Sequence, residues 1–382
     1  MKPYLFPFFL AACLLFASSC SDDTEGGDTE PPPDPEPPAE TPADFTERGP
    51  LEVGVTTTSL ADSSRDRTLA LEVWYPTEDA GDASAVLDFA VDSDQAQALG
   101  PLLEAAPSDC VATSTGATRD ASPLEGSYPV VFYSHCYTCT RWSAHAVMER
   151  LASHGFVVVA PDHTSDTLFD RLEVDFPPLD ADLVALRIAD VRFVIDEVLD
   201  GGVLPSGVAA DAARLGMLGH SLGSVTSGGV AEQDDRISAV AGLAAPMENP
   251  LTPGVDIEAI NVPLALLLAT EDNSIGLAGN VVLQANFENA NPPAYRLDLI
   301  DGGHWSVTNI AGIDTAYEPG CGDGTRQESG EPFTYLDVDR ANDLTATFVT
   351  AFFVAHLDED DAGFDLLDES AWSDDAVFEA RE

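Results

Sequence analysis

Residues 214–223 read Arg-Leu-Gly-Met-Leu-Gly-His-Ser-Leu-Gly, and this stretch decides the fold that we expect for the rest of the chain. A short apolar run, 215–218, leads into a G-x-S-x-G pattern with Ser221 at its centre. The pattern is typical of a nucleophile elbow, in which a buried strand ends in a sharp turn that carries a serine and a helix follows. Gly219 and Gly223 are needed because a side chain there would clash with the neighbouring strand or helix. Ser221 is therefore the candidate nucleophile, and the helix N-terminus behind it favours developing negative charge.

The composition bounds the size of the protein and its class of partner. The 382 residues suffice for one large α/β domain with additions or for two small domains. The chain carries 67 acidic against 16 basic residues, a net charge near −51. This charge argues against a nucleic-acid partner and disfavours anionic membrane surfaces. We interpret it as a solvated acidic surface, suited to a saline environment, rather than as a site for a specific cationic ligand.

The N-terminal residues 1–19 have the pattern of a bacterial lipoprotein signal peptide. Lys2 supplies a positive start, residues 4–16 form an apolar run too short to span a bilayer, and small residues precede Cys20. We expect cleavage before Cys20 and a lipid on its sulfur, which predicts an exported protein of the cell envelope, at the outer membrane or cell surface. Cys13 follows better lipobox residues but leaves a very short apolar run, and an ordinary secretory signal is the other alternative.

A Pro-rich, acidic segment over residues 20–46 offers almost nothing to bury, so we expect a disordered, extended linker. The folded domain is expected over residues 47–382. It ends in an acidic tail from Asp358. The tail contains several large apolar residues, so we expect part of it to pack against the domain.

The cysteines of the expected domain are Cys110, Cys136, Cys139 and Cys321, and export would let them oxidise. Four cysteines allow three pairings, and the sequence leaves the pairing open. Cys136 and Cys139 form a C-x-x-C pattern, which can indicate a redox or metal site. The chain has no second such pair and no thioredoxin-like context, so we favour one or two structural disulfides.

From Pro129 onward, expected strands and helices alternate, which is the pattern of a mostly parallel sheet covered by helices on both faces. Before them we expect two strands joined by a polar turn, the second ended by Pro76, then a helix over 94–106 and a Ser/Thr/Gly-rich loop. Residues 161–180 and 311–333 are expected to be loops. The expected strands are 51–58, 68–75, 130–133, 156–160, 215–218, 237–243, 263–270 and, as the last one, 295–300; the later helices are 142–153, 181–199 and 339–357.

A serine hydroxyl is a poor nucleophile at neutral pH and needs a base that a carboxylate orients. In α/β-hydrolases these groups follow one another along the chain as Ser, acid, His, each at the end of a strand. The buried run 263–270 is followed by Glu271 and Asp272. We expect Asp272 to be the orienting acid, with Glu271 as the alternative.

The candidate base is His304, which follows the next expected strand and comes after the acid. Two glycines before it let the loop fold the imidazole back toward the elbow. His163 lies at a strand end near the site, where it could line the site. We interpret the remaining candidates as packing or surface residues: His154, His220 and His356.

An acyl-transfer site also needs backbone N–H donors for the tetrahedral oxyanion. One is the amide of Leu222, directly after the nucleophile. The other should come from the turn after the 130–133 strand, within residues 134–137.

Five short motifs occur along the chain: 71–76 (LEVWYP), 133–135 (YSH), 151–156 (LASHGF), 160–163 (APDH) and 189–193 (ADVRF). Together they resemble the bacterial predicted dienelactone hydrolases, which are serine hydrolases similar to platelet-activating-factor acetylhydrolase and to polyester-degrading hydrolases. The resemblance covers roughly residues 50–357. It implies an α/β-hydrolase fold with a mostly parallel central sheet flanked by helices, Ser-Asp-His catalysis, ester substrates and no cofactor. It also implies that Ser221 is the nucleophile, His304 the base, and Tyr137 and Leu222 the oxyanion donors.

The chain departs from this family in two places. The family has glycine where this chain has Cys136, directly before Tyr137, the implied donor. In the acetylhydrolase branch the acid follows the strand after the elbow helix, but here that strand ends in Ala-Ala-Pro at 244–246. The acid is therefore expected at the commoner position, Asp272. Dienelactone hydrolase itself uses a cysteine nucleophile, and Ser221 argues against that activity.

These observations predict an exported, lipid-anchored serine hydrolase that cleaves carboxylic esters, of small-molecule or lipid-like type, through an acyl-serine intermediate. No metal site is expected. One alternative keeps the triad in a lipase directed at phospholipid or polyester. Another is a surface lipoprotein that only binds ligands, and the complete triad in the right order argues against it.

Overall fold

The structure is a computed structural model that describes residues 44–368 and 371–382, all within one compact unit, Pro42–Glu382. The expected signal peptide, the lipid site at Cys20 and nearly all of the expected linker lie outside the described residues. Within those residues, none of the helices combines the length and the apolarity that a membrane crossing requires.

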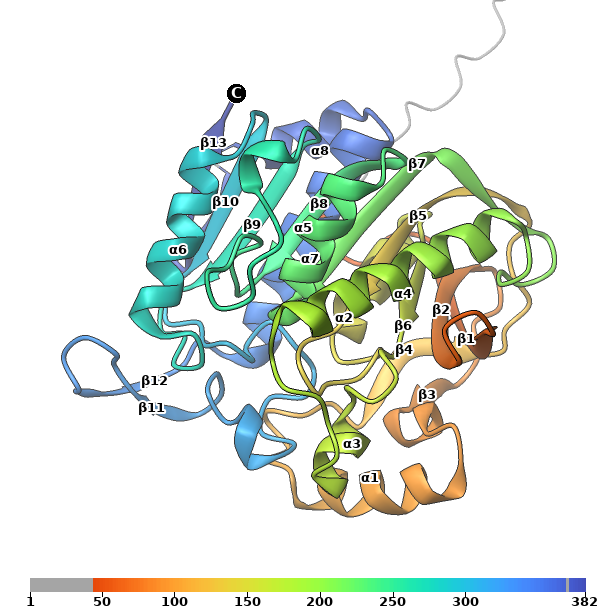
Figure 1. Cartoon of the computed structure of the whole chain (residues 1–382), viewed down its shortest axis with the longest axis horizontal. Coiled ribbons are helices and arrows are strands. Elements are labelled where there is room, and N and C mark those ends of the chain that lie inside the picture. Colours follow the sequence, from red (N-terminus) through yellow and green to blue (C-terminus); the bar gives the residue numbers. More distant parts are fainter. Residues whose placement is uncertain (1–43, 369–370) are drawn as a thin grey trace, which may run out of the picture. The chain divides into compact units, whose positions relative to one another are not determined.

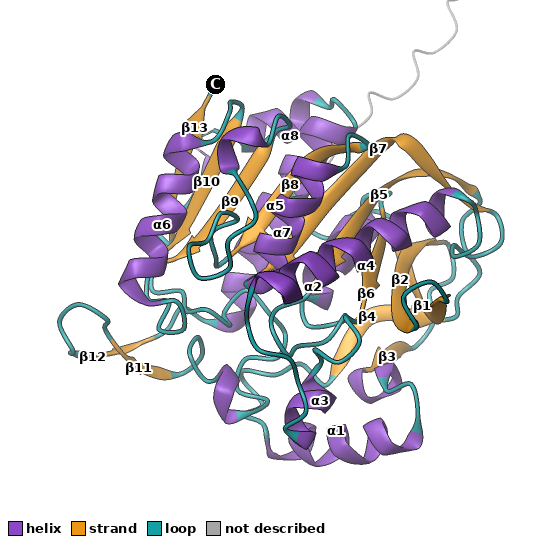
Figure 2. Ribbon diagram, viewed as in Figure 1, coloured by secondary structure: helices purple, strands orange, loops and turns teal. Residues whose placement is uncertain are grey.

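A mostly parallel sheet forms the middle layer (Figures 1 and 2), as the sequence predicts. Within the described residues it has 11 strands in the order β13-β10-β9-β8-β7-β5-β6-β2-β1-β4-β3. The neighbours from β10 to β6 are all parallel, whereas β13 and β2 run antiparallel to the strands that they flank. A separate pair, β11 and β12, is antiparallel. The strands are β1 (Glu52–Asp62), β2 (Arg67–Thr77), β3 (Ala83–Ala85), β4 (Ser114–Arg119), β5 (Gly126–Ser134), β6 (Val157–Pro161), β7 (Val208–His220), β8 (Ile237–Leu243), β9 (Leu264–Ala269), β10 (Ala294–Leu299), β11 (Asp323–Thr325), β12 (Pro332–Thr334) and β13 (Ala376–Arg381).

Helices cover both faces of the sheet (Figure 2), and each face has its own apolar core. Along β5, Val130 and Phe132 pack with α4 and α5, whereas Val131 and Tyr133 pack with α2 and α7. Successive side chains of a strand point to opposite faces, so a nearly continuous apolar run fills both cores. The helices are α1 (Ser93–Ala105), α2 (His145–Ser153), α3 (Leu168–Glu173), α4 (Ala181–Leu199), α5 (Leu222–Gln233), α6 (Gly276–Asn289), α7 (Val338–Leu357) and α8 (Asp361–Leu366), with short 3₁₀ turns at Val86–Phe89, Ile257–Ala259 and Thr315–Tyr317.

Some expectations for the elements are wrong. Pro76 does not end β2, which runs on to Thr77; Pro76 pairs with Val53, and its carbonyl accepts the Leu124 N–H at 2.9 Å. The expected loop over 161–180 contains α3, which a capping box at Thr167 begins. The strand over 295–300 is not the last, because the acidic tail returns as β13 beside β10.

Two disulfides join the described cysteines. Cys110 pairs with Cys321, and Cys136 pairs with Cys139, with Cα–Cα distances of 5.8 and 5.2 Å. The first links the segment before β4 to the long loop between β10 and α7. The second closes the turn that follows β5.

Candidate active site

The elbow places Ser221 between β7 and α5 in a strained conformation. Its φ of 56° and ψ of −119° lie in a region that non-glycine residues rarely adopt. Two backbone bonds hold the turn: Ser221 N–H donates to the Leu243 carbonyl at 2.9 Å, and Ser224 N–H donates to the Ser221 carbonyl at 2.8 Å. The hydroxyl is thus presented at the carboxyl end of the central strand and at the start of a helix.

The glycines that flank the serine are required by close approach, as predicted. A Cβ at Gly219 would overlap with the backbone of Gly223, and a Cβ at Gly223 would overlap with the Ser134 carbonyl at the end of β5. The second approach brings the first turn of α5 directly against the turn that follows β5. The two predicted oxyanion donors, Leu222 and Tyr137, belong to these two adjoining segments.

Ser221, His304 and Asp272 form one continuous chain of hydrogen bonds. The Ser221 hydroxyl lies 2.9 Å from Nε2 of His304, and Nδ1 of His304 lies 2.7 Å from Oδ2 of Asp272. Asp272 is completely buried, His304 is nearly so, and Ser221 is half-buried. Because a carboxylate only accepts, the Asp272 contact puts the His304 proton on Nδ1 and leaves Nε2 free to accept from the serine. This is the arrangement that activates a serine for attack on a carbonyl carbon.

The structure resolves the choice between the two candidate acids. Asp272 follows β9, and its Oδ1 accepts the N–H groups of Ser274 and Ile275, both at 3.0 Å. Those bonds leave Oδ2 to face His304. Glu271 instead accepts from the Arg326 guanidinium at 2.9 Å. Asp272, and not Glu271, is therefore the residue brought to the imidazole.

The loop that carries His304 is held by the 319–320 segment. A Cβ at Gly303 would lie 2.6 Å from the Gly320 Cα and 2.7 Å from the Pro319 carbonyl oxygen. Trp305 N–H donates to that Pro319 carbonyl at 3.0 Å. Gly303 is thus needed for packing against this segment, which the Cys110–Cys321 disulfide ties to the body of the domain.

The turn after β5 contains Tyr137, the predicted second oxyanion donor. The Tyr137 side chain is half-buried, donates from its hydroxyl to the Pro177 carbonyl at 2.5 Å, and packs edge-on against Phe176. Among the described residues, no group accepts a hydrogen bond from the Tyr137 backbone N–H. It therefore has the free hydrogen-bonding capacity that an oxyanion donor needs.

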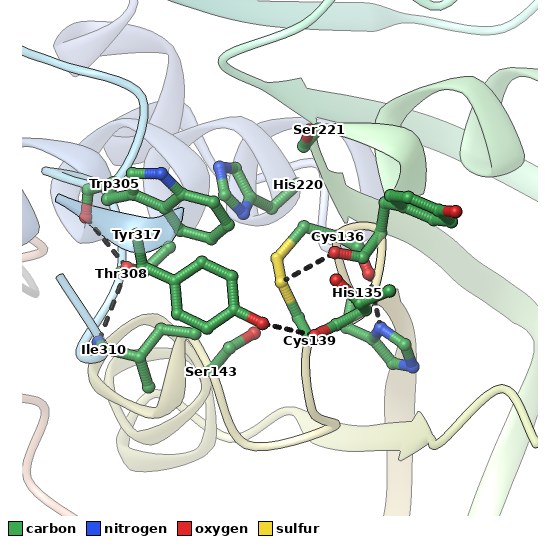
Figure 3. Close-up of a disulfide and its surroundings, with 12 residues drawn as sticks. His135, Cys136, Cys139, Ser143, His220, Ser221, Trp305, Thr308, Ile310 and Tyr317 are labelled. Carbon is green, nitrogen blue, oxygen red and sulfur yellow. Dashed lines mark hydrogen bonds between the residues drawn. A yellow bond between two sulfur atoms is a disulfide. The ribbon is translucent and has the colours of Figure 1, made fainter. Parts of the chain in front are cut away.

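Figure 3 shows the Cys136–Cys139 disulfide in this turn, below Ser221 and beside Trp305 and Tyr317. The Tyr317 hydroxyl donates to the Thr138 carbonyl, and the Tyr317 ring packs on Trp305, next to His304. The turn and the His304 loop are thus joined through aromatic packing.

The remaining histidines divide into two kinds. His154 follows α2 and bonds to the Glu47 carbonyl, and His356 bonds to the Tyr295 hydroxyl near the end of α7, so both fit the packing interpretation. His220 is fully buried beneath His304. His163 is also fully buried, behind the turn, and so does not line the site as its position at a strand end suggested.

Sequence reasoning missed two charged residues behind the turn, Arg187 and Asp166. Both are buried, and they form an ion pair of 2.8 Å. One feature of the sequence could have indicated this ion pair. Arg187 is a basic residue on the apolar side of the expected helix 181–199, in a chain with few basic residues. No group of side chains among the described residues could hold a metal ion.

Two family models match parts of the chain. The chlorophyllase family model matches residues 120–244, and the model of platelet-activating factor acetylhydrolase, isoform II, matches residues 41–168. The first match contains Ser221, the second contains the turn with Tyr137, and neither reaches Asp272 or His304. No curated protein matches the chain.

Among solved structures, a ferulic acid esterase from Streptomyces cinnamoneus is similar, with a TM-score of 0.61 and 24% identity. The match covers 81% of this chain and 92% of that one. The chain therefore has the α/β-hydrolase fold, as expected. The two partial family matches and this fold are in line with the resemblance that the sequence motifs indicate.

Proposed function

We propose that the protein is a serine hydrolase that cleaves carboxylic esters through an acyl-serine intermediate. The observation that carries the proposal is the unbroken hydrogen-bond chain from Ser221 through His304 to Asp272, with the serine on a strained elbow. A site that only bound ligands would have no need of a buried carboxylate that fixes the tautomer of a histidine beside a serine hydroxyl.

In the first half-reaction, Ser221 Oγ attacks the ester carbonyl carbon while His304 Nε2 takes the hydroxyl proton. The carbonyl oxygen becomes an oxyanion, which the amides of Leu222 and Tyr137 stabilise by hydrogen bonds. As the intermediate collapses, the bond to the alkoxy oxygen breaks, and protonated His304 gives its proton to the departing alcohol. Asp272 remains ionised throughout and stabilises the imidazolium.

In the second half-reaction a water molecule replaces the alcohol. His304 Nε2 removes a proton from this water as its oxygen attacks the acyl carbon, and a second tetrahedral oxyanion forms between the same two amides. Collapse breaks the bond to Ser221 Oγ, and His304 returns the proton to the serine. The products are a carboxylic acid and the free enzyme, with no redox change.

We further propose that the mature protein is exported and carries a lipid on Cys20. The support is sequence-based: a positively charged start, a short apolar run and small residues before the cysteine. The same export would permit the disulfides Cys110–Cys321 and Cys136–Cys139 to form.

The test is hydrolysis of p-nitrophenyl esters of graded acyl length by the purified chain, alongside labelling by a fluorophosphonate. We expect turnover and labelling in the natural chain, and neither in Ser221→Ala. The acyl length at which kcat/KM peaks separates an esterase of short acyl groups from a lipase of long ones. A natural chain that folds but neither turns over any ester nor reacts with the phosphonate would exclude a working serine and favour ligand binding alone.

A further inference from the structure

A second set of Ser, His and Asp side chains lies behind the turn that follows β5, and the proposed mechanism does not use it. Ser134 Oγ lies 3.0 Å from Nε2 of His163, and Nδ1 of His163 lies 3.3 Å from Oδ2 of Asp190. All three side chains are completely buried, so no substrate reaches this serine. They come from the YSH, APDH and ADVRF motifs of the sequence, which the triad of the active site leaves unexplained.

The direction of each hydrogen bond in this set follows from its neighbours. Asp190 only accepts, so Nδ1 of His163 carries the proton and Nε2 accepts. Ser134 therefore donates its hydroxyl proton to His163, while its oxygen accepts from the Arg187 guanidinium at 3.2 Å. Burial, with the charge of Arg187, lowers the pKa of His163 to about 3, which keeps this ring neutral.

His163 in turn fixes the tautomer of His135. The His163 backbone N–H donates to Nε2 of His135 at 3.0 Å, so that nitrogen is unprotonated. Burial and the charge of Arg187 lower the pKa of His135 well below its ordinary value, and the neutral ring must then carry its proton on Nδ1. Nδ1 lies 2.7 Å from the Cys136 carbonyl oxygen and donates to it.

The Cys136 carbonyl belongs to the same peptide group as the Tyr137 N–H. In a trans peptide these two groups point in opposite directions. A donor that holds the Cys136 carbonyl on the buried side therefore turns the Tyr137 N–H away from that side. Arg187 adds to the hold, because it donates to the His135 carbonyl and, at 3.5 Å, to the Cys136 carbonyl.

Asp166 also anchors the turn after β5 by hydrogen bonds. It pairs with Arg187 at 2.8 Å and accepts the Thr138 N–H at 2.8 Å. The peptide groups before and after the one that carries the Tyr137 N–H are thus hydrogen-bonded to buried side chains. The Tyr137 N–H itself has no partner among the described residues. A fixed donor of this kind needs no reorganisation when charge develops on a reacting oxygen.

We propose that His135 is a positioning residue of the oxyanion hole, which holds the Cys136 carbonyl through Nδ1 and so directs the Tyr137 N–H to the tetrahedral oxyanion. The His163 backbone N–H fixes its tautomer, and Ser134 of the buried set accepts from Arg187, which donates to the His135 and Cys136 carbonyls. The inference rests on the proposed ester hydrolysis and deepens it, since it explains how a turn with Cys136 in place of glycine still presents a donor.

The test compares His135→Phe, which keeps a flat ring but loses the donor, with His135→Asn, whose side-chain amide retains a donor near the position of Nδ1. We expect His135→Phe to lower kcat about 10²-fold, the effect of losing one oxyanion donor, with little change in KM. His135→Asn should recover most of that loss. His154→Phe is the matched control, because it also removes a histidine bond to a backbone carbonyl, but away from the site; its kcat should equal that of the natural chain.

Affinity for a trifluoromethyl ketone, measured by calorimetry, supplies a readout that needs no turnover. The ketone forms a tetrahedral oxyanion on a serine, so its binding should weaken in His135→Phe by the same factor as kcat/KM. Loss of ester hydrolysis in the natural chain would count against the proposed function, whereas equal ketone affinity in the natural chain and His135→Phe would overturn only the positioning role. Equal losses in the Phe and Asn variants would also overturn it.

If His135→Phe does not fold, Ser134→Ala tests whether the buried set acts on the oxyanion hole, because it removes a single oxygen from that set. We expect its kcat to fall several-fold at unchanged KM. A folded Ser134→Ala protein with the kcat of the natural chain would overturn the proposal that this set acts on the oxyanion hole.

Discussion

His220 lies beneath His304, with ring centroids 5.0 Å apart, and its Nε2 donates to the His304 backbone carbonyl at 2.9 Å. A carbonyl only accepts, so the proton of His220 is on Nε2. Burial lowers the pKa of His220 well below its ordinary value, and the ring is neutral. The residue directly before the proposed nucleophile therefore holds the backbone of the proposed base.

Replacing this support should impair turnover without removing any triad member. We expect His220→Phe to lower kcat about 10-fold to 10²-fold, because a small shift of His304 lengthens its bond to Ser221. His220→Gln, whose amide nitrogen can reach the same carbonyl, should lose less. Steady-state kinetics on a p-nitrophenyl ester measures kcat of both variants. Identical losses of kcat would show that the hydrogen bond from residue 220 to the His304 carbonyl does not support turnover.

The triad itself gives the largest effects. Ser221→Ala, His304→Ala and Asp272→Asn should each lower turnover by several orders of magnitude, since the three groups act as a unit. Glu271→Gln is the control, because Glu271 faces Arg326 and not the imidazole, and it should stay within about threefold of the natural rate. Unchanged circular dichroism confirms that the variants fold. Near-normal turnover in Asp272→Asn would contradict the assignment of the acid.

The two disulfides should differ in what they support. Removing Cys136–Cys139, in a double alanine variant, should lower kcat more than it raises KM, because a displaced turn is felt mainly in the transition state. Removing Cys110–Cys321 should instead cost about 2–4 kcal/mol of unfolding free energy, since it closes a long loop. Kinetics and urea unfolding of both variants separate the two effects. Cys136 and Cys139 found as free thiols in fully active enzyme would contradict the first expectation.

The buried histidines predict loss of stability in acid. Burial, assisted by Arg187, lowers the pKa of His163 from 6.5 to about 3. Between these values the unfolded chain binds a proton that the folded chain does not, so stability that is present above pH 6.5 is lost as the pH falls toward 3. Asp166 acts in the opposite sense, because burial raises its pKa from 3.8 to about 6. His135 and His220, both with lowered pKa, act with His163 and leave a net loss in acid.

The measurement is the urea midpoint between pH 7 and pH 4. The natural chain should lose stability across this range, and His163→Gln, which removes one titrating group, should lose less. A midpoint that stays constant, or an equal slope in both proteins, would show that these groups do not titrate as the burial indicates.

The proposed lipid anchor is tested by Cys20→Ser in a bacterial expression host. We expect the variant to leave the membrane fraction or to accumulate unprocessed, because the modified sulfur is absent. If Cys13→Ser has this effect and Cys20→Ser does not, the lipid site is the earlier cysteine.

Much of the fold could be predicted because its strands carry strong local signals. The apolar runs of β8 and β9 and the G-x-S-x-G pattern after β7 set the parallel sheet and the position of the nucleophile. Asp272 and His304 followed from their order along the chain after two of those strands. Such signals depend only on residues close together in the sequence.

The rest depended on contacts between distant segments. The β13 strand is short and includes the charged residues Glu379 and Arg381, and it is recognisable only by its pairing with β10. Arg187 and Asp166 come together from a helix and a loop. Neither position alone therefore indicated that the two residues anchor the turn after β5. The disulfide pairing likewise depends on where the chain returns, which counting cysteines does not show.

The position of β13 has a consequence for synthesis of the protein. This strand lies at Ala376–Arg381, after every residue of the site, yet it covers the edge of β10, whose side chains are largely buried. A growing chain that already holds Ser221, Asp272 and His304 still presents an unpaired edge, which is prone to join another chain. We expect the emergence of β13, rather than synthesis of the triad, to time completion of the sheet, and a nascent chain stalled after α7 to require a chaperone.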